Sequence, residues 1–355
     1  MRIGILTFHR AYNYGAILQC YALQETLKNK GHEVFVINYK QPFIDNIYKP
    51  FRFIYWLKAL LRLRPLAVIY PFGIITRIKR KTNFVYFRNE YLQCTDDCMP
   101  SNIPGDFDRI IIGSDQLWNS KLTGGIDAVY WGNFKRVTNC KLLTYAMSTS
   151  INDLKSIANS YITRSIKNFS FLSVREEALS QYFQEEFGIK TETVLDPTLI
   201  ASPDIWDRFI NKKYEKIKYI LIYHAGRNYK GNPNFLKEKA EYLAKELDCR
   251  IIDLSSGKYK PEDFVSLFKY ASYVVTTSFH AVAFSIIFNR PMYAYKLNDG
   301  HDSRYENILK AIHADKMLVD VDFIPCVDYP DYSAINSNLQ ALKLKSLNYL
   351  KYACS

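Results

Sequence analysis

The residues Thr276-Thr277-Ser278-Phe279-His280 combine a backbone suited to anions with a side chain that exchanges protons. The apolar, β-branched run at 273–275 before them predicts a buried strand. An apolar segment of helical character starts at His280 and ends before Asn289-Arg290-Pro291. A strand that turns directly into a helix leaves backbone N–H groups unpaired, and these groups favour a phosphate or carboxylate. Because histidine exchanges a proton near neutral pH, this stretch predicts an anion site beside a proton donor.

A structural interpretation of the same residues stays open at this stage. The hydroxyls of Thr276, Thr277 and Ser278 can simply cap a helix. His280 can equally be a partly buried histidine whose nitrogens are satisfied within the fold. The local pattern alone does not separate these two interpretations.

The N-terminal elements indicate how such a site would be held. Residues 3–8 read as a buried strand, 9–16 as a polar turn and 17–30 as a helix that Gly31 ends, and a second strand follows at 34–39. This βαβ order is typical of an open parallel sheet, in which ligands bind at the carboxyl ends of the strands. We therefore expect a site at the turn 9–15, although a dinucleotide-binding GxGxxG loop is missing from it.

Polar clusters also follow the later predicted strands, at 113–119, 148–150 and 175–177. A second series of alternating strands and helices begins at the predicted strand 219–223, after a connecting segment at 204–209. We expect an α/β protein with two parallel sheets that face each other across a cleft. The predicted parts are an N-terminal domain at 1–204, a C-terminal domain at 205–332 and a C-terminal helix at 333–355.

Residues 41–90 interrupt the alternation and are predicted to form a basic helical insertion. Residues 54–64 read as an apolar and basic helix, and a second basic segment runs over 74–87. A basic helix with Trp and Leu can lie on an anionic membrane surface, which predicts peripheral membrane contact through 52–81. The alternative is an insertion packed on its own domain, with the basic residues facing water.

The composition limits the class of protein and of partner. With 355 residues, 48% of them hydrophobic, the chain is long enough for about two domains. Its net charge of +12 favours a polyanion, a membrane surface or small anionic substrates. We expect no nucleic-acid partner, because the Lys and Arg residues form no long block. Seven scattered cysteines, no apolar run of about 18 residues and no signal-peptide pattern predict a cytoplasmic protein with reduced thiols.

Five motifs, in order along residues 1–312, carry a resemblance to a known family. They are Asn13-Tyr14-Gly15-Ala16 with Leu18-Gln19, Gly113-Ser114-Asp115-Gln116-Leu117-Trp118-Asn119, Ser173-Val174-Arg175-Glu176, Leu195-Asp196-Pro197-Thr198, and Thr277-Ser278-Phe279-His280-Ala281 followed by Pro291. Together they resemble the polysaccharide pyruvyl transferase family. The resemblance implies two facing Rossmann-like domains on the plan of GT-B glycosyltransferases. It also implies that the N-terminal domain binds the acceptor and the C-terminal domain binds the donor.

The implied activity belongs to surface polysaccharide biosynthesis, of capsule or exopolysaccharide. The pyruvyl unit of phosphoenolpyruvate is moved onto two hydroxyls of a sugar, which forms a cyclic ketal and releases phosphate. Phosphoenolpyruvate is then a co-substrate, and we expect neither a cofactor nor a metal. The resemblance implies that His280 is the general acid and that Arg175 holds the donor. Arg175 also has a structural interpretation, an ion pair with Glu176 or Glu177.

The chain departs from the family pattern at Ser278, where many members have arginine. A substitute cation could come from Arg304, Lys296 or Arg227, and we favour Arg304 because it follows a C-terminal strand and the loop 298–302. The expected donor-binding residues are Arg175, Ser278, Phe279, Arg304 and Lys296.

The transfer also needs a base for the sugar hydroxyl and groups that hold the sugar. For the base we expect Asp115, whose alternative role is to cap the following turn. Asn13, Tyr14 and Gln116 can hydrogen-bond sugar hydroxyls, and Trp118 can stack on a sugar face. Each of these four can equally be a packing residue.

Two other functions fit the same sequence. The first is a GT-B-type glycosyltransferase that uses a nucleotide sugar, since it would share the anion site and the sugar cleft. The second is a basic module that binds a membrane surface, which the net charge and residues 52–81 favour. A lipid-linked acceptor would join the membrane contact to the enzyme activity.

Overall fold

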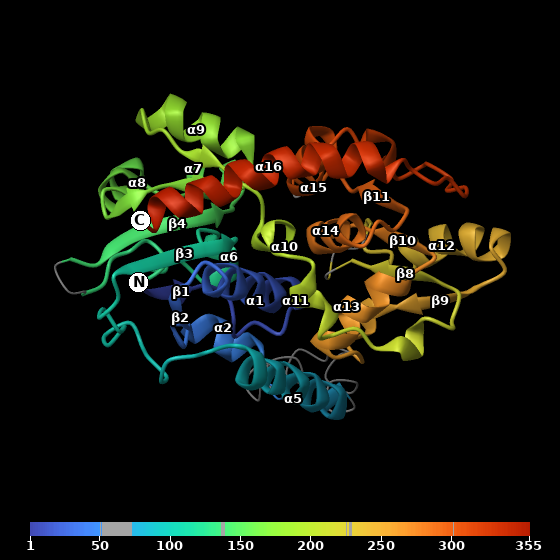
Figure 1. The fold of residues 1–355 in the computed structure, drawn as a ribbon, viewed down its shortest axis with the longest axis horizontal. Coiled ribbons are helices and arrows are strands. Elements are labelled where there is room, and N and C mark those ends of the chain that lie inside the picture. Colours follow the sequence, from blue (N-terminus) through green and yellow to red (C-terminus); the bar gives the residue numbers. More distant parts are fainter. Residues whose placement is uncertain (50, 52–72, 136–138, 225, 227–228, 301) are drawn as a thin grey trace, which may run out of the picture.

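The computed structural model describes residues 1–49, 51, 73–135, 139–224, 226, 229–300 and 302–355. Two parallel β-sheets, each flanked by helices, build an α/β fold (Figure 1). The predicted fold class is therefore confirmed. The helix predicted at 54–64 lies outside the described residues.

The first sheet has seven strands among the described residues, in the order β2-β1-β3-β4-β6-β7, with β5 beside β4. Its strands are β1 (Arg2–Leu6), β2 (Glu33–Val36), β3 (Arg109–Asp115), β4 (Lys141–Met147), β5 (Phe169–Phe171), β6 (Ser173–Val174) and β7 (Glu192–Thr193). All of these strands pair in parallel. The strand order reverses between β1 and β3, and ligands of open α/β sheets bind at such a switch point.

The second sheet repeats this plan with five described strands in the order β12-β11-β10-β8-β9. Its strands are β8 (Tyr219–Tyr223), β9 (Arg250–Asp253), β10 (Tyr273–Thr276), β11 (Met292–Lys296) and β12 (Leu318–Asp320). They also pair in parallel, and their order reverses between β8 and β10. The short edge strand β12 has no counterpart among the predicted strands.

Helices cover both sheets and connect them. In the first part of the chain they are α1 (Tyr14–Lys28), α2 (Pro42–Ile47), α5 (Ile74–Tyr91), α6 (Ser120–Thr123), α7 (Ile151–Lys155), α8 (Asn159–Ile166), α9 (Glu177–Phe187), α10 (Pro197–Ile200) and α11 (Asp204–Asp207). The second part has α12 (Phe235–Glu246), α13 (Pro261–Tyr270), α14 (Phe279–Ile287), α15 (Ser303–Ala311) and α16 (Tyr332–Ala353), with 3₁₀ turns at 212–214, 254–256 and 315–317. One continuous helix was expected from about 151 to 169, but α7 and α8 are separate helices there.

Helix α1 is buried on almost every side because it lies between the first sheet and the second domain (Figure 1). The hydroxyl of Tyr14 donates to the carbonyl of Tyr259, 2.8 Å away, and its ring stacks on Phe264. Tyr21 packs on Trp206 close to the connection between the domains. A single apolar core therefore continues from one domain into the other, and the two domains meet in a packed seam.

The C-terminal helix α16 lies across both domains (Figure 1). Near its start, the amide of Asn338 donates to the carbonyl of Ile312 in the second domain. Near its end, the hydroxyl of Tyr349 donates to the carbonyl of Thr144 in the first sheet. Residues 333–355 thus act as a strap between the domains.

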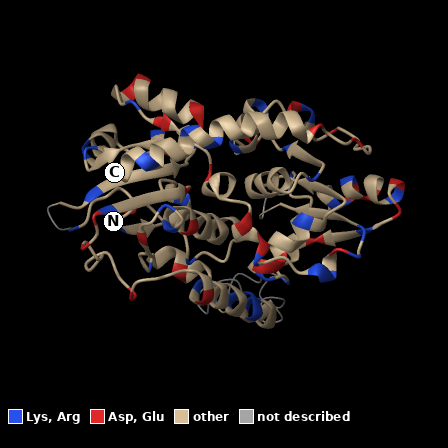
Figure 2. Cartoon of the chain, viewed as in Figure 1, with Lys and Arg blue, Asp and Glu red and all other residues tan. Residues whose placement is uncertain are grey.

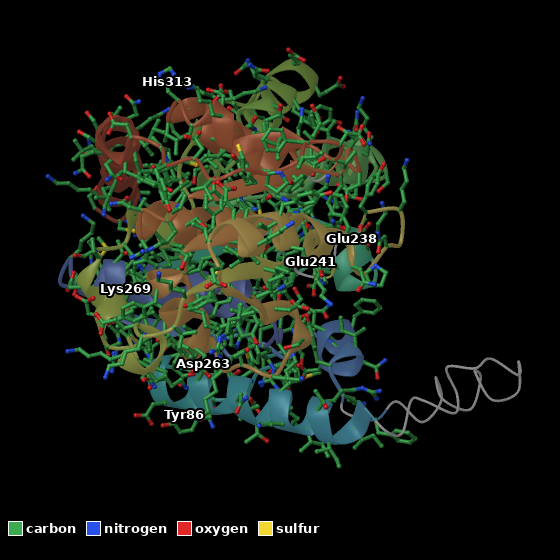
Figure 3. All side chains as sticks on the ribbon, turned by 90° about the vertical axis from the view of Figure 1, so that its right-hand side faces the viewer. Tyr86, Glu238, Glu241, Asp263, Lys269 and His313 are labelled. Carbon is green, nitrogen blue, oxygen red and sulfur yellow. The ribbon has the colours of Figure 1, made fainter. Side chains whose placement is uncertain are left out.

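Helix α5 forms the described part of the predicted insertion and packs below α1 and α13 (Figure 1). Phe84 and Phe87 point into the core, while Tyr86 lies at the outer edge of the molecule (Figure 3). Among the described helices, none is both long and apolar enough to span a bilayer. All seven cysteines are described, and each is a free thiol.

Candidate active site

The N-terminus of α1 in the first domain and the N-terminus of α14 in the second domain meet at His280. Each helix follows a strand at the point where the strand order of its sheet reverses. His280 is in the first turn of α14, directly after β10, and Gly15 is in the first turn of α1, after β1. A Cβ atom built on Gly15 would lie 2.0 Å from Nδ1 of His280. No side chain larger than glycine fits there unless the imidazole moves, so the close packing of the two domains requires Gly15.

An acidic and a basic residue from the first domain reach the same point. The Oδ2 atom of Asp196 lies 3.9 Å from Nε2 of His280 and accepts a hydrogen bond of 2.9 Å from Nη1 of Arg175. All three residues are buried. We call His280, Asp196 and Arg175 the histidine cluster. At 3.9 Å the carboxylate acts on the imidazole through its charge, because the distance is too long for a hydrogen bond.

Asp196 is held in place by its own sequence motif. It follows β7 and precedes Pro197, the first residue of α10. Its Oδ1 atom accepts hydrogen bonds from the amide and the hydroxyl of Thr198, and its Oδ2 atom accepts one from the hydroxyl of Ser114. Burial raises the pKa of Asp196, but the charges of His280 and Arg175 and the bonds from Thr198 outweigh burial and leave this pKa below its ordinary value. Asp196 is therefore a buried anion.

Arg175 is enclosed by two carboxylates and an aromatic ring. Its Nε atom donates to Glu176 over 3.2 Å, and its guanidinium lies 4.3 Å from the centre of the Phe279 ring. This is a cation–π arrangement. Although burial lowers the pKa of Arg175, the carboxylates of Glu176 and Asp196 raise it above the ordinary value. The Nη2 atom is buried and has no hydrogen-bond partner among the described residues, so the guanidinium keeps one donor for a ligand.

The pKa of His280 is set by burial and by four nearby charged side chains. Burial lowers its pKa, the carboxylates of Asp196 and Asp115 act in the opposite direction, and the guanidiniums of Arg175 and Arg304 lower the pKa further. The net effect is a pKa below the ordinary 6.5, so the unliganded imidazole is neutral at pH 7. Its Nε2 atom is buried and lacks a hydrogen-bond partner within the described structure. A bound dianion would raise the pKa and favour the imidazolium form.

Arg304 shares a cavity with Arg175 and Phe279. The cavity has a volume of about 280 Å³ and lies between the first domain, α15 and α16. Arg304 is in the first turn of α15. The structure thus brings together the two arginines that were expected to bind the donor, although α14 itself carries no arginine at its start.

Ser278 stands immediately before α14, as the local pattern predicted. Its backbone N–H donates to the hydroxyl of Thr276, and its side chain makes no hydrogen bond that caps the helix. The hydroxyl of Thr276 also donates to the carbonyl of Tyr223 on the neighbouring strand. The structural interpretation therefore holds for Thr276, which satisfies local backbone groups.

Lys296 is placed apart from the histidine cluster. Its Nζ atom forms an ion pair with Asp320 across the adjacent strands β11 and β12, over 3.0 Å. Lys296 does not line the cavity of Arg175 and Arg304, so this placement gives no support to a role in donor binding. Arg227 lies outside the described residues.

Asp115 lies at the carboxyl end of β3 and close to the histidine cluster. Its charge acts on both His280 and Arg175. Its Oδ1 atom accepts a hydrogen bond of 2.9 Å from the backbone N–H of Gln116, which is a local turn contact of the kind anticipated. The turn contact is therefore present, and the role of Asp115 as a base stays a prediction.

Two of the four residues expected to bind the acceptor are almost completely buried. Trp118 is 2% exposed, its indole stacks on Trp131 at 4.4 Å, and its Nε1 donates to the carbonyl of Tyr130. Tyr14 is 1% exposed and belongs to the seam between the domains. The packing interpretation describes both residues in this structure, because a sugar cannot stack on a ring that is already covered on both faces.

The other two expected acceptor residues also have local roles. The carbonyl oxygen of the Asn13 side chain accepts from the N–H of Ala16 and caps α1. Gln116 is 6% exposed, and its Oε1 accepts from the amide of Asn119 over 3.5 Å. Asn13 is only partly buried, so part of its side chain remains accessible to solvent.

Asp196 of the histidine cluster and Gly15 beside it received no role from sequence reasoning. Asp196 was noted only within its motif, yet an Asp followed by Pro after an apolar strand signals a helix cap whose second oxygen is left for another partner. Gly15 sits in the first turn of a helix, where glycine is costly, and this cost was a usable sign of close packing. The described residues contain no group of three His, Cys, Asp or Glu side chains arranged to hold a metal.

Comparisons with solved structures give weak similarities over nearly the whole chain. A UDP-GlcNAc 2-epimerase from Methanocaldococcus jannaschii is 12% identical, with 96% of this chain and 92% of that chain covered and a TM-score of 0.47. The glycosyltransferase SsfS6 from Streptomyces sp. SF2575 is 11% identical, with coverages of 98% and 96% and a TM-score of 0.43. An alpha-glucosyltransferase solved with UDP-glucose and DNA is 12% identical, with coverages of 99% and 92% and a TM-score of 0.48.

Sequence comparisons identify the family. Among curated proteins, none matches this sequence. The family model described as polysaccharide pyruvyl transferase matches residues 13–299, which include Gly15, Asp115, Arg175, Asp196 and His280. The chain therefore belongs to the polysaccharide pyruvyl transferase family, a family of transferases that modify polysaccharides.

Proposed function

We propose that this protein transfers the pyruvyl unit of phosphoenolpyruvate onto two hydroxyls of a sugar, forming a cyclic ketal and releasing phosphate. One observation carries this proposal most directly. The unpaired Nε2 of His280 lies among two carboxylates and two arginines at the point where both switch points meet. An acid beside cationic groups is what protonation of an anionic enol phosphate requires.

The donor would bind at the start of α14. The N–H groups in the first turn of a helix favour an anion, and α14 begins at Phe279. Arg175 adds a charged donor whose Nη2 is unpaired within the described structure, and Arg304 lines the same cavity. Arginine suits carboxylate and phosphate because its planar donors bind both in pairs. In this proposal Arg304 supplies the charge that Ser278 lacks.

The reaction would proceed through two additions at one carbon. His280 donates a proton to the methylene carbon of the donor, and the first sugar hydroxyl adds to the neighbouring carbon while Asp115 accepts the hydroxyl proton. Phosphate then leaves and takes up the proton held by Asp115, the second hydroxyl adds to the same carbon, and its proton returns to His280. Both carboxylates next to His280 stabilise the imidazolium form that starts the cycle.

Release of inorganic phosphate tests the reaction. Purified protein, phosphoenolpyruvate and a panel of free and lipid-linked sugars should give phosphate only with the correct acceptor, together with a product heavier than that acceptor by one pyruvic acid minus one water. Phosphate release without a modified sugar, or none with any member of a broad panel, would contradict the proposal.

The alternative, a glycosyltransferase that uses a nucleotide sugar, predicts a different ligand. A ligand that binds the folded state raises the melting temperature, and the increase grows with the ratio of free ligand concentration to Kd. We expect phosphoenolpyruvate to raise it and UDP-sugars to leave it unchanged. The opposite pattern would favour the glycosyltransferase.

We further propose that the protein contacts an anionic membrane through α5, which would bring it to a lipid-linked acceptor at the cytoplasmic face. The outer face of α5 exposes Ile75 (80%), Ile78 (48%) and Tyr86 (51%) beside the exposed Lys79 and Lys81. Lys and Arg residues gather along this helix (Figure 2). Exposed apolar side chains between basic ones are typical of helices that lie on anionic membranes.

Liposome flotation tests this contact. Binding to vesicles that contain phosphatidylserine should fall strongly when Lys79 and Lys81 are both replaced by Glu. Replacing Lys237 and Lys245 of α12 by Glu makes the same change of charge on a helix of the second domain. Equal loss of binding in both variants would show general electrostatics and would contradict a specific role of α5.

A further inference from the structure

The cavity that contains Arg175 and Arg304 extends well beyond what a small anion contacts. Beyond the two arginines, its lining includes polar side chains and a set of apolar side chains, and the apolar set comes from three separate parts of the fold: the turn after β7, α15 and α16. The residues of this apolar set are Val194, Leu195, Leu199, Ile308, Ala311 and Leu342. With a volume of about 280 Å³, the cavity is close to the lower end of the range of small-molecule sites, roughly 300–1,000 Å³.

The polar groups that this cavity leaves unsatisfied are donors. Nη2 of Arg175 and Nδ2 of Asn307 are buried, and neither has a hydrogen-bond partner among the described residues. Arg175 is 8% exposed, so more than nine-tenths of this charged residue is buried at the cavity wall. Lys345 of α16 adds a third positive side chain to those of Arg175 and Arg304. Buried donors without acceptors are costly, and a ligand that carries acceptors would remove that cost.

The carboxylates near the cavity do not cancel this preference. Asp196 lines it, but both of its oxygens accept hydrogen bonds from within the protein, from Arg175, Ser114 and Thr198. Glu177 also lines the cavity and lies in the first turn of α9. Among the lining residues, three cationic side chains thus stand against the two carboxylates of Asp196 and Glu177, an excess of one positive charge, and Arg175 is itself ion-paired with Asp196.

We infer that this cavity binds a small amphipathic anion, a carboxylate, phosphate or phosphonate with an apolar body of about the size of a phenyl ring. The anionic group would lie at Arg175, Arg304 and Lys345. The apolar body would lie against Leu199, Ile308 and Leu342, where phosphoenolpyruvate itself places nothing. The ligand would therefore exclude the donor from Arg175 and inhibit transfer, a consequence that rests on the proposed function.

The test compares phosphonates that share a head group and differ in their apolar body. Binding of methylphosphonate, butylphosphonate and phenylphosphonate to the purified full-length protein is measured by calorimetry. We expect affinity to rise along this series, with phenylphosphonate binding at least about tenfold more tightly than methylphosphonate, because burial of apolar surface favours the larger body. Equal affinities across the series would overturn the inference.

A pair of variants on α16 localises the effect. Leu342→Trp fills the apolar end of the cavity, whereas Leu344→Trp adds the same side chain at a position on this helix that is 53% exposed. In Leu342→Trp the ratio of the affinity for phenylphosphonate to the affinity for methylphosphonate should fall close to one, while methylphosphonate still binds. Leu344→Trp should keep the wild-type preference. A preference that survives Leu342→Trp would place the apolar contact elsewhere and overturn the inference.

The outcome does not depend on the catalytic proposal. The phosphonate series and the melting temperatures of both variants require no turnover, so a protein that fails to use phosphoenolpyruvate can still show the preference. Conversely, active protein without the preference would contradict the inference alone. Where binding is found, competition with phosphoenolpyruvate in the phosphate-release assay then checks that both anions use Arg175.

Discussion

Two polar segments at the carboxyl edge of the first sheet behave very differently. In the segment 113–119, Trp118, Gln116 and the turn at Asp115 satisfy one another or neighbouring backbone groups. In the segment 173–198, Arg175 and Asp196 cross the seam towards His280 and Phe279, and Arg175 keeps an unpaired donor. Both segments have polar residues at strand ends, as expected of a ligand site. The second keeps a buried donor without a partner, Nη2 of Arg175, whereas the side chains of the first mostly have partners within the protein.

The difference lies in what each segment packs against. Trp118 points into the core of its own domain, next to Trp131 and Phe183. Arg175 and Asp196 point at the start of a helix from the other domain, where an anion is favoured. Polar groups at a boundary between domains can stay unsatisfied at a tolerable cost only if a ligand pairs with them, and such groups therefore mark the site.

The strongest test of this comparison is loss of the imidazole. His280→Gln should lower kcat by about 10²–10⁴-fold, the range that general acid catalysis supplies, while donor affinity changes little because the cations remain. The measurement is steady-state phosphate release, with donor affinity from calorimetry. His313→Asn, at an exposed histidine far up the second domain (Figure 3), is the control. Activity within a few-fold of wild type would remove His280 from the chemistry.

Asp115 is the ionisable residue of the segment 113–119 whose charge acts on His280 and Arg175. Asp115→Asn keeps the shape of the side chain and its hydrogen bond to the N–H of Gln116, but it removes the charge. We expect kcat to fall by about 10²-fold, the low end of the range for a general base. Asp127→Asn, at a carboxylate that bonds Tyr39, is the matched control. Unchanged turnover would exclude Asp115 as the base and would leave only its hydrogen bond with Gln116 as a role.

Gly15 tests whether the position of the ring matters. In Gly15→Ala the new Cβ would overlap Nδ1 of His280, so the ring must shift, and a shift of that size can cost about 10²-fold in rate. Gly73→Ala, where the Cβ meets the flexible end of Arg77, controls for the substitution itself. Full activity and an intact melting temperature in Gly15→Ala would show that the ring moves without consequence.

The pH dependence should differ between the free enzyme and the complex. Burial holds the pKa of His280 below 6.5 in the unliganded protein, and the acid form is lost as the pH rises through that pKa. We therefore expect kcat/KM to decline from a pH below 6.5 upwards, because it reports the free enzyme. The bound dianion raises the pKa, so kcat should decline only at a higher pH. Coincident profiles would argue against proton uptake on donor binding.

The smallest catalytic effect is expected at Trp118. Trp118→Phe removes the hydrogen bond to Tyr130 and part of the stack on Trp131. This should lower the free energy of unfolding by about 2 kcal/mol, measured by urea denaturation, and leave the KM for the acceptor unchanged. A raised KM for the acceptor with unchanged stability would show that Trp118 contacts the sugar and would contradict the packing role.

Much of the fold follows from the sequence pattern. The predicted strand at 219–223 matches β8 residue for residue, because it is an apolar, β-branched and aromatic run with clear boundaries. The break between α7 and α8 and the strand β12 were not foreseen. Both are short elements, and packing decides such elements more than local preference does.

The candidate site was foreseen in part. His280, Arg175 and Arg304 are near one another as expected, since strand ends of parallel sheets gather at one edge. Lys296 is not, because it pairs with Asp320 on the next strand. Neither the role of Asp196 nor that of Gly15 was assigned, since both depend on which residues of the other domain approach them.

The sequence alone determined the class of fold, the family and the position of His280 at the start of a helix, because periodicity, breakers and motif order are properties of the chain. Only the tertiary structure decided which polar residues serve a site and which serve the core. Trp118 and Arg175 follow their strands in the same way, but one is satisfied inside its own domain and the other across the seam. That distinction rests on contacts between segments far apart in sequence, such as Gly15 with His280 and α16 with both domains.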